Sequence, residues 1–316
     1  MPRTQLHLDA NSPSIIVPVT ARDRSELGRQ AEALARARAG AVGVGVGAGV
    51  DGVDGGAGAD GGADGGADIR AYEAEDDQDP AGAARPFDLI EWRVDLYEPF
   101  TATAGGATAG GGGASGGGFD PVPVVAALGA LAAALPDTPI LATFRTTAEG
   151  GGAPLSDELY VRLVDTLAAS GLAAAVDVEY RHPLAARAIA TAHEHGVAVV
   201  ASNHDFDATP PVEEIVARLA AMEEAGADVA KIAVMPRSAA DVVTLLAATE
   251  RRYRDAGIPL ITMSMGASGA VTRVGGGAFG SAATFATVGE ASAPGQLPAA
   301  GVRAALDLLH PGAGQP

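Results

Sequence analysis

The feature that most constrains the fold is a regular alternation of short apolar runs with longer amphipathic stretches along most of the chain. A short apolar run is typical of a strand that is buried on both faces, and apolar residues spaced three and four apart indicate a helix packed against it. Glycine follows four of the amphipathic stretches, where helices often end in a left-handed residue: Gly171, Gly196, Gly226 and Gly257. The alternation predicts a parallel β-sheet covered by helices.

Eight strands are predicted, with helices between them. The strands are residues 14–19, 87–95, 140–145, 175–179, 198–203, 229–234, 260–264 and 282–288, and helices are predicted at 22–38, 122–135, 156–170, 183–195, 211–225 and 238–256. Eight repeats favour an α/β fold closed into a (β/α)8 barrel, the TIM barrel. An open doubly wound sheet is the alternative, but the G-x-G-x-x-G match at residues 47–52 follows no predicted strand and precedes no helix, so it does not support a dinucleotide site.

Two low-complexity stretches interrupt the pattern, at residues 40–86 and 101–119. The first carries ten acidic residues against two arginines and so accounts for −8 of the net charge of −18, and the second is mostly Gly, Ala and Thr. Both have too few large apolar side chains to offset the entropy of ordering, so we expect two flexible insertions in a single domain that spans residues 1–316. About 250 residues remain without them, an ordinary length for a barrel.

Composition excludes several classes of function. The chain has no cysteine, which removes disulfides, thiolate zinc sites and cysteine nucleophiles. The net charge of −18 argues against nucleic acid as a partner, because phosphate binding needs a basic surface. No apolar run approaches the ~18 residues of a membrane span, and the first residues do not read as a signal peptide. We therefore expect a cytoplasmic protein.

Lys231 is the only lysine beside 20 arginines. A composition rich in Ala, Gly and Arg indicates a coding bias that replaces dispensable lysines, so the lysine that remains is expected to do what arginine cannot. Unlike arginine, lysine can lose its proton and attack a carbonyl carbon. Lys231 also lies in an apolar strand-like run, where a surface role does not fit.

Reacting groups of a (β/α)8 barrel come from the C-terminal ends of the strands. Glu91 with Arg93, and Asp177 with Glu179, are spaced by two, so both members of each pair face the same side of their strand. For Asp177 and Glu179, salt bridges inside the barrel are an equally good interpretation. The polar candidates at strand ends are Glu91, Arg93, Arg145, Glu149, Asp177, Glu179, His204, Lys231 and Arg273.

These residues lie in motifs that together resemble the type I 3-dehydroquinate dehydratases. The motifs are Glu-Trp-Arg-Val-Asp at 91–95, Thr-Phe-Arg-Thr at 143–146 with Glu149-Gly-Gly, Val-Asp-Val-Glu at 176–179, Ser-Asn-His-Asp-Phe at 202–206, Lys-Ile-Ala-Val-Met-Pro at 231–236, Met263-Ser-Met-Gly, Gly280-Ser-Ala-Ala-Thr-Phe and Ser292-Ala-Pro-Gly-Gln296. They occur in order along the chain, and each is absent from the two low-complexity stretches.

The resemblance implies a hydro-lyase that dehydrates 3-dehydroquinate to 3-dehydroshikimate in the shikimate pathway, towards the aromatic amino acids. It implies a lysine Schiff base, no metal or cofactor, and a homodimer. Lys231 matches the Schiff-base lysine, His204 the general acid and base, and Glu149 the carboxylate that assists it. The substrate-binding residues implied are Glu91, Arg93, Arg145, Arg273 (for the substrate carboxylate), Met265, Ser292 and Gln296. Pro18 departs from the family, in which serine is common at that position.

Three alternatives stay open. A class I aldolase would share the lysine and would need a phosphate site, for which Gly275 to Gly277 are candidates. A metal-dependent hydrolase could use His204 and Asp205. A binding or regulatory protein could keep the barrel without activity. Outside the site, Trp92 is expected to face the outer helices, and His193 and His195 to be exposed.

Deleting residues 41–85 and bridging the gap with a short linker is expected to leave a folded protein with unchanged activity. The tract lies between a helix and the next strand, at the barrel end opposite the strand C-termini. Since the entropy of closing a loop grows slowly with its length, the free energy of unfolding should change by less than ~2 kcal/mol. Urea unfolding of the two proteins measures the change, and a deletion variant that does not fold contradicts the prediction.

Overall fold

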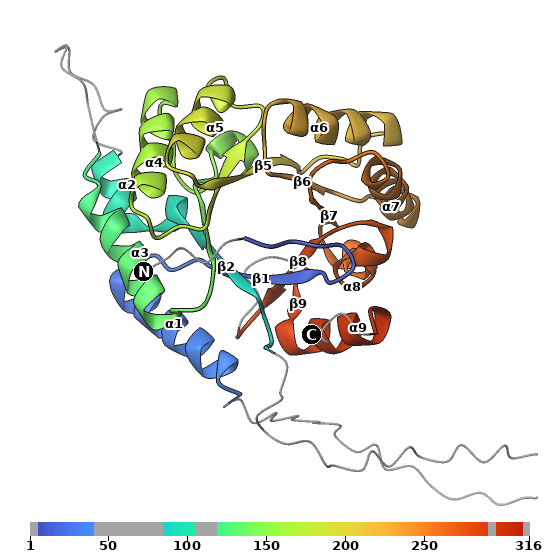
Figure 1. The fold of residues 1–316 in the computed structure, drawn as a ribbon, viewed down its shortest axis with the longest axis horizontal. Coiled ribbons are helices and arrows are strands. Elements are labelled where there is room, and N and C mark those ends of the chain that lie inside the picture. The colour runs from blue at the N-terminus through green and yellow to red at the C-terminus, as the bar shows by residue number, and fades with distance from the viewer. Residues whose placement is uncertain (1–5, 41–84, 105–118, 290–294, 312–316) are drawn as a thin grey trace, which may run out of the picture.

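The computed structural model describes residues 6–40, 85–104, 119–289 and 295–311. In this part of the chain eight parallel strands form a ring with helices outside it (Figure 1). The strands are β1 (Ser14–Val19), β2 (Leu89–Arg93), β3 (Ile140–Thr143), β4 (Ala175–Glu179), β5 (Ala198–Asp205), β6 (Val229–Val234), β7 (Leu260–Ser264) and β8 (Ala283–Thr287). A short β9 (Leu297–Pro298) pairs in parallel with the end of β8. The helices are α1 (Arg24–Arg38), α2 (Glu98–Ala104), α3 (Val122–Ala134), α4 (Asp157–Ala169), α5 (Ala185–Glu194), α6 (Val212–Glu224), α7 (Ala239–Tyr253), α8 (Val271–Gly275) and α9 (Ala299–Leu309).

The ring closes between β7 and β8. Neighbouring strands pair in chain order from β1 to β7, and β1 also pairs with β8. The remaining gap is closed by a parallel bridge between Leu260 and Ser281, where the Ala282 N–H donates to the Leu260 carbonyl oxygen at 2.7 Å. A closed sheet leaves no unpaired edge, as the barrel interpretation requires, and the open-sheet alternative is wrong.

All eight predicted strands and the six predicted helices are present, with ends that differ by a few residues. Three further helices, α2, α8 and α9, are not predicted from the sequence. Helix α2 reaches into the stretch 101–119, and beyond that stretch's centre Phe119 is buried against Phe100, with ring centroids 5.1 Å apart. These two rings are large apolar side chains of a kind that the Gly- and Ala-rich centre of the stretch lacks in its sequence. The predicted insertions otherwise lie outside the described residues, at 41–84 and 105–118.

Side chains fill the barrel in layers, because alternate residues of each strand point inward. Near the N-terminal ends every strand gives one apolar residue: Ile16, Leu89, Leu141, Ala175, Val200, Val229, Ile261 and Ala283. Leu6 and Leu8, in the segment before β1, are partly buried and pack against this interior cluster. Two residues further along the strands come Pro18, Glu91, Thr143, Asp177, Ser202, Lys231, Met263 and Phe285. The interior thus changes from apolar to charged along the barrel axis.

Outward-facing strand residues pack under the helices. Trp92, fully buried in the core between strands and helices, stacks edge-on to Tyr97 with ring centroids 5.7 Å apart, as expected from its position between Glu91 and Arg93. In the described part of the chain no helix combines the length and apolar character that crossing a membrane would take.

Candidate active site

Lys231 lies inside the barrel on β6, with 2% of its surface exposed. Its Nζ is 3.2 Å from Glu91 Oε1 and 3.4 Å from Asp177 Oδ2, and it sits 4.7 Å from the centre of the Phe285 ring. The two acidic residues and the ring belong to the same interior layer as Lys231, which explains why strands far apart in the sequence bring them together. An ammonium group in this position is compensated by charge and by the π-face.

Arg145, which follows β3, joins the charged side chains around Lys231. Its Nη2 donates to Asp177 Oδ1 at 2.9 Å, and its Nη1 contacts Glu179 Oε1 at 3.2 Å and Ser202 Oγ at 2.8 Å. Burial alone would lower the pKa of Arg145, but the surrounding carboxylates outweigh burial and raise it. The salt-bridge interpretation of Asp177 and Glu179 is therefore confirmed. Arg145 is only 3% exposed, so its guanidinium holds the neighbouring side chains in place and has little contact with solvent.

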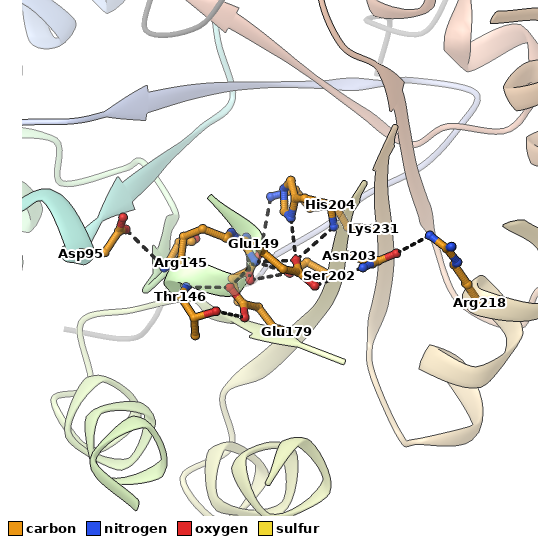
Figure 2. Close-up of polar contacts among 12 residues, drawn as sticks. Asp95, Arg145, Thr146, Glu149, Glu179, Ser202, Asn203, His204, Arg218 and Lys231 are labelled. Carbon is orange, nitrogen blue, oxygen red and sulfur yellow. Dashed lines mark hydrogen bonds and ion pairs between the residues drawn. The ribbon is translucent and has the colours of Figure 1, made fainter. Parts of the chain in front are cut away.

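Glu149 and His204 form a hydrogen-bonded pair beside Lys231 (Figure 2). Glu149 ends a 3-10 turn (η4, Thr147–Glu149), and its Oε2 lies 2.9 Å from His204 Nδ1 while accepting the His204 backbone N–H at 3.0 Å. His204 lies on β5, the strand paired with β6, where Ser202 is opposite Lys231. The structure thus brings together the three residues to which the resemblance assigns catalysis.

The surroundings shift the pKa values of the two members of this pair in opposite directions. Burial raises the pKa of Glu149 to about 7, while Arg145 and a hydrogen bond from Asn203 oppose the rise. Burial, followed by the cations of Arg145, Lys231 and Arg93, lowers the pKa of His204 well below 6.5. The histidine is thus neutral at neutral pH. When the glutamate is ionised, it accepts Nδ1–H and leaves the Nε2 lone pair free to take a proton.

Asp177 lies in the opposite electrostatic situation. Burial alone would raise the pKa of Asp177, but Arg145 and Lys231 outweigh it and lower the pKa. Ser202 Oγ also donates to Asp177 Oδ1 at 2.7 Å. Asp177 therefore stays ionised as a fixed counter-charge to Lys231.

Arg273 on α8 is a buried cation of a different kind. It is 4% exposed, its Nη1 donates to the Phe285 carbonyl oxygen at 3.3 Å, and its buried Nε has no hydrogen-bond partner in the described part of the chain. Burial lowers the pKa of Arg273, and no carboxylate among the described residues opposes that effect. A buried guanidinium without a counter-ion fits an anionic ligand, which it can hold with parallel hydrogen bonds.

The other predicted binding residues differ in what they contact. Glu91 contacts Lys231 directly, and Arg93 is held by Asp95 through two hydrogen bonds of 2.8 and 2.7 Å. Met265 packs against the interior cluster, and Gln296 is partly buried before β9. Ser292 lies outside the described residues.

Several residues of the site were not identified from the sequence. Thr143 Oγ1 donates to Glu91 Oε1 at 3.0 Å, and the Arg145 backbone N–H donates to Asp95 Oδ1 at 3.2 Å. Asn203 Nδ2 donates to Glu149 Oε1 at 3.1 Å. The alternation of inward and outward residues along β5 predicts that Asn203 faces outward. Its contact with Glu149 could not be predicted, because the turn that carries Glu149 has no periodic pattern.

The structure also tests the alternatives based on other residues. Gly277 packs against Pro13 and His310, at the end of the barrel opposite Lys231, so the glycines that an aldolase phosphate site would need are in the wrong place. Asp205 faces Arg218 on α6, whereas His204 faces Glu149, so His204 and Asp205 do not converge on a metal ion. His193 is exposed and His195 is partly exposed, and they contact Asp228 and Asp165 respectively.

A buried amine, a neutral histidine and an unpaired arginine together suit a reaction on a small anionic carbonyl compound. The amine can form an imine, which withdraws electrons and acidifies the neighbouring C–H bond. The histidine can move the proton, and the arginine can fix the anionic group.

Comparison with known proteins agrees with this chemistry. Residues 69–313 match the family model described as type I 3-dehydroquinase. Over 225 residues the chain is 49% identical to the 3-dehydroquinate dehydratase of Listeria monocytogenes, covering 71% of this chain and 82% of the relative. The corresponding protein of Neisseria gonorrhoeae is 45% identical over 230 residues, which are 72% of this chain and 84% of that protein.

Solved structures show the same likeness. The type I 3-dehydroquinate dehydratase of Clostridium difficile, solved with covalently modified comenic acid, has a TM-score of 0.73 at 30% identity, covering 98% of this chain and 97% of that one. The 3-dehydroquinate dehydratase of Geobacillus kaustophilus has a TM-score of 0.70 at 33% identity, with 94% and 91% covered.

The turn that carries Glu149 depends on a glycine. A Cβ at Gly151 would lie 1.8 Å from the Arg145 carbonyl oxygen, so Gly151→Ala must open the turn. We expect the variant to lose about 1–3 kcal/mol of unfolding free energy, as overpacked sites do. Gly129→Ala is the control, because a Cβ there meets no atom within 4 Å and should stabilise α3 by about 0.5–1 kcal/mol. Urea unfolding measures both, and equal stability of the two variants contradicts the prediction.

Proposed function

Because this chain belongs to the type I 3-dehydroquinase family, we propose that it converts 3-dehydroquinate to 3-dehydroshikimate through an imine formed on Lys231. The enzyme is a hydro-lyase, and the reaction is a step of the shikimate pathway towards the aromatic amino acids. The observation that carries the proposal is the position of the only lysine, buried in the barrel between two carboxylates and beside the Glu149–His204 pair.

Lys231 supplies the nucleophile. Its amine attacks the ring ketone carbon of the substrate, and loss of water from the resulting carbinolamine gives an iminium ion. Glu91 Oε1, at 3.2 Å from Nζ, is close enough to accept the proton that the nitrogen loses as the carbinolamine forms. Asp177, held ionised by Arg145 and Lys231, balances the positive charge of the iminium.

His204 moves the proton. The neutral imidazole takes the proton from the carbon next to the iminium, and the C–H electrons form an enamine. The enamine then expels the hydroxyl group, to which the imidazolium returns the proton, so that water leaves and a conjugated iminium forms. Hydrolysis of that iminium releases the product and regenerates Lys231. Glu149 accepts Nδ1–H and stabilises the transient imidazolium.

The arginines orient the substrate. Arg273 lacks a counter-ion among the described residues and suits the substrate carboxylate. Glu91, Arg93 and Arg145 line or support the pocket, as Met265 does on its wall. From the family resemblance we also assign Ser292 and Gln296 to substrate binding. These steps use side chains and water alone, so the proposal includes no cofactor or metal.

Two further proposals come from the sequence. The enzyme works in the cytoplasm, and it assembles as a homodimer. The dimer is supported by the family resemblance, and sedimentation of the purified protein measures it.

The first test is covalent trapping of the imine. Borohydride added with 3-dehydroquinate should reduce the iminium and leave a stable adduct on Lys231, detected by mass mapping of peptides. Lys231→Arg keeps the charge but should give no adduct, because a guanidinium does not form the imine. An adduct on the N-terminal amine, or none at all, would contradict the proposal.

The second test separates His204 from the nucleophile. His204→Ala should still form the borohydride-trapped adduct but should turn over at least ~10²-fold more slowly, the usual loss for a general acid and base. Turnover is followed as ultraviolet absorbance of the conjugated product. The matched controls are His193→Ala and His195→Ala, which contact outer carboxylates and should leave turnover unchanged. A control variant as slow as His204→Ala would mean that the assignment is wrong.

A further inference from the structure

Arg218 is a buried arginine outside the barrel that is connected to the site through the side chain of Asn203. It lies on α6, is 8% exposed, and its Nη1 donates to Asn203 Oδ1 at 3.0 Å and to Asp205 Oδ2 at 3.1 Å. Its Nε donates to Glu214 Oε1 on the same helix at 3.1 Å. Figure 2 shows Arg218 on the far side of Asn203 from Glu149.

The contact fixes which way the Asn203 amide points. A guanidinium can only donate hydrogen bonds, so Asn203 must turn its oxygen towards Arg218. Its Nδ2 then points the other way and donates to Glu149 Oε1 at 3.1 Å. If the amide turned over, an NH2 group would face the guanidinium and a carbonyl oxygen would face the carboxylate. Both contacts would then be repulsive.

We propose that Arg218 is a positioning residue for the Glu149–His204 pair and acts through the Asn203 amide. This inference rests on the proposed acid and base role of His204. Glu149 has two oxygens, of which Oε1 is held by Asn203 and Oε2 by the backbone and ring of His204. Arg218 thus keeps the carboxylate oriented so that Oε2 meets Nδ1.

The Asn203 hydrogen bond also favours the ionised carboxylate, which matters because burial raises the pKa of Glu149 to about 7. The other titratable or charged groups that face Glu149 are Arg145, Asp177, Glu179 and His204. None of them is among the hydrogen-bond partners of Arg218 in the described part of the chain, which are Glu214, Asn203 and Asp205. Loss of the Asn203 donor removes a contact that lowers the pKa of Glu149. Its pKa therefore rises further, and the carboxyl keeps its proton to a higher pH.

The test is Arg218→Met, which keeps the apolar length of the side chain and removes its donors. The acid limb of the plot of kcat against pH should move to higher pH by about one unit. On the acid side this shift lowers kcat by up to about tenfold. The two profiles should converge at alkaline pH, where the carboxyl is ionised in both proteins. KM for 3-dehydroquinate should stay the same, and Lys231 should still be trapped by borohydride.

Arg252→Met is the matched control. Arg252 is also a buried arginine of the helical layer, on α7, but its partner is Glu223 of α6 and not a residue of the site. This variant should lose stability and keep the acid limb of the parent. Arg218→Lys, which can still donate to Asn203 Oδ1, should restore most of the parent's profile.

Two further variants test the route through the amide. In an Asn203→Ala background, adding Arg218→Met should move the acid limb no further. Asn203→Asp keeps a partner for Arg218 but cannot donate to Glu149, so it should move the limb in the same direction even if Arg218→Met does not fold.

The outcomes separate the inference from the proposed function. A parent protein that does not dehydrate 3-dehydroquinate would overturn the proposed function, and the inference with it. If the parent is active, any one of three results overturns the inference alone. These are an unchanged acid limb in Arg218→Met or in Asn203→Asp, an equal shift of the acid limb in Arg252→Met, or a further shift of the acid limb when Arg218→Met is added to Asn203→Ala.

Discussion

The rest of the site depends on the ion pairs and hydrogen bonds that the Arg145 guanidinium makes. It contacts Asp177 and Glu179 of β4 and Glu149 of the turn after β3, and it reaches Ser202 on β5. Such charges inside a barrel are stable only when they compensate one another, and removing one partner of a buried set leaves an unpaired charge that costs about 3–5 kcal/mol. The cluster therefore links three consecutive strands and the turn that carries Glu149 into one arrangement.

The cluster around Arg145 and Lys231 holds more carboxylates than cations, and Glu149 is the carboxylate that the cations compensate least. Asp177 lies between Arg145 and Lys231, and its pKa is lowered. Glu149 meets Arg145 only at 3.5 Å, and burial raises the pKa of Glu149 to about 7. Two carboxyls in one site are thus tuned in opposite directions, which is the usual way in which a fold assigns a fixed charge and a proton-sensitive partner. The proton-sensitive one is in contact with His204.

The periodicity of the strands predicts most of this arrangement. Glu91, Asp177 and Lys231 each lie two residues after an apolar inward-facing residue, so the sequence places them in one layer. Contacts made outside that periodicity could not be predicted. Glu149 reaches His204 only because an irregular turn folds back, and Arg218 belongs to a helix whose pattern indicates just an amphipathic face. Arg145 is a cation at a strand end in the sequence, and only the assembled barrel shows that its partners are internal.

The distribution of charge also explains how an anionic substrate would be oriented under the proposed function. The carboxylates gather around Lys231 and Arg145, so this side of the interior repels an anion, whereas Arg273 on α8 has no carboxylate partner among the described residues. The substrate carboxylate is therefore favoured at Arg273 and disfavoured beside Glu91 and Asp177. Because both attraction and repulsion act in a buried site, they select one orientation of the ring. That orientation turns the ketone, the part of the substrate without charge, towards the Lys231 amine.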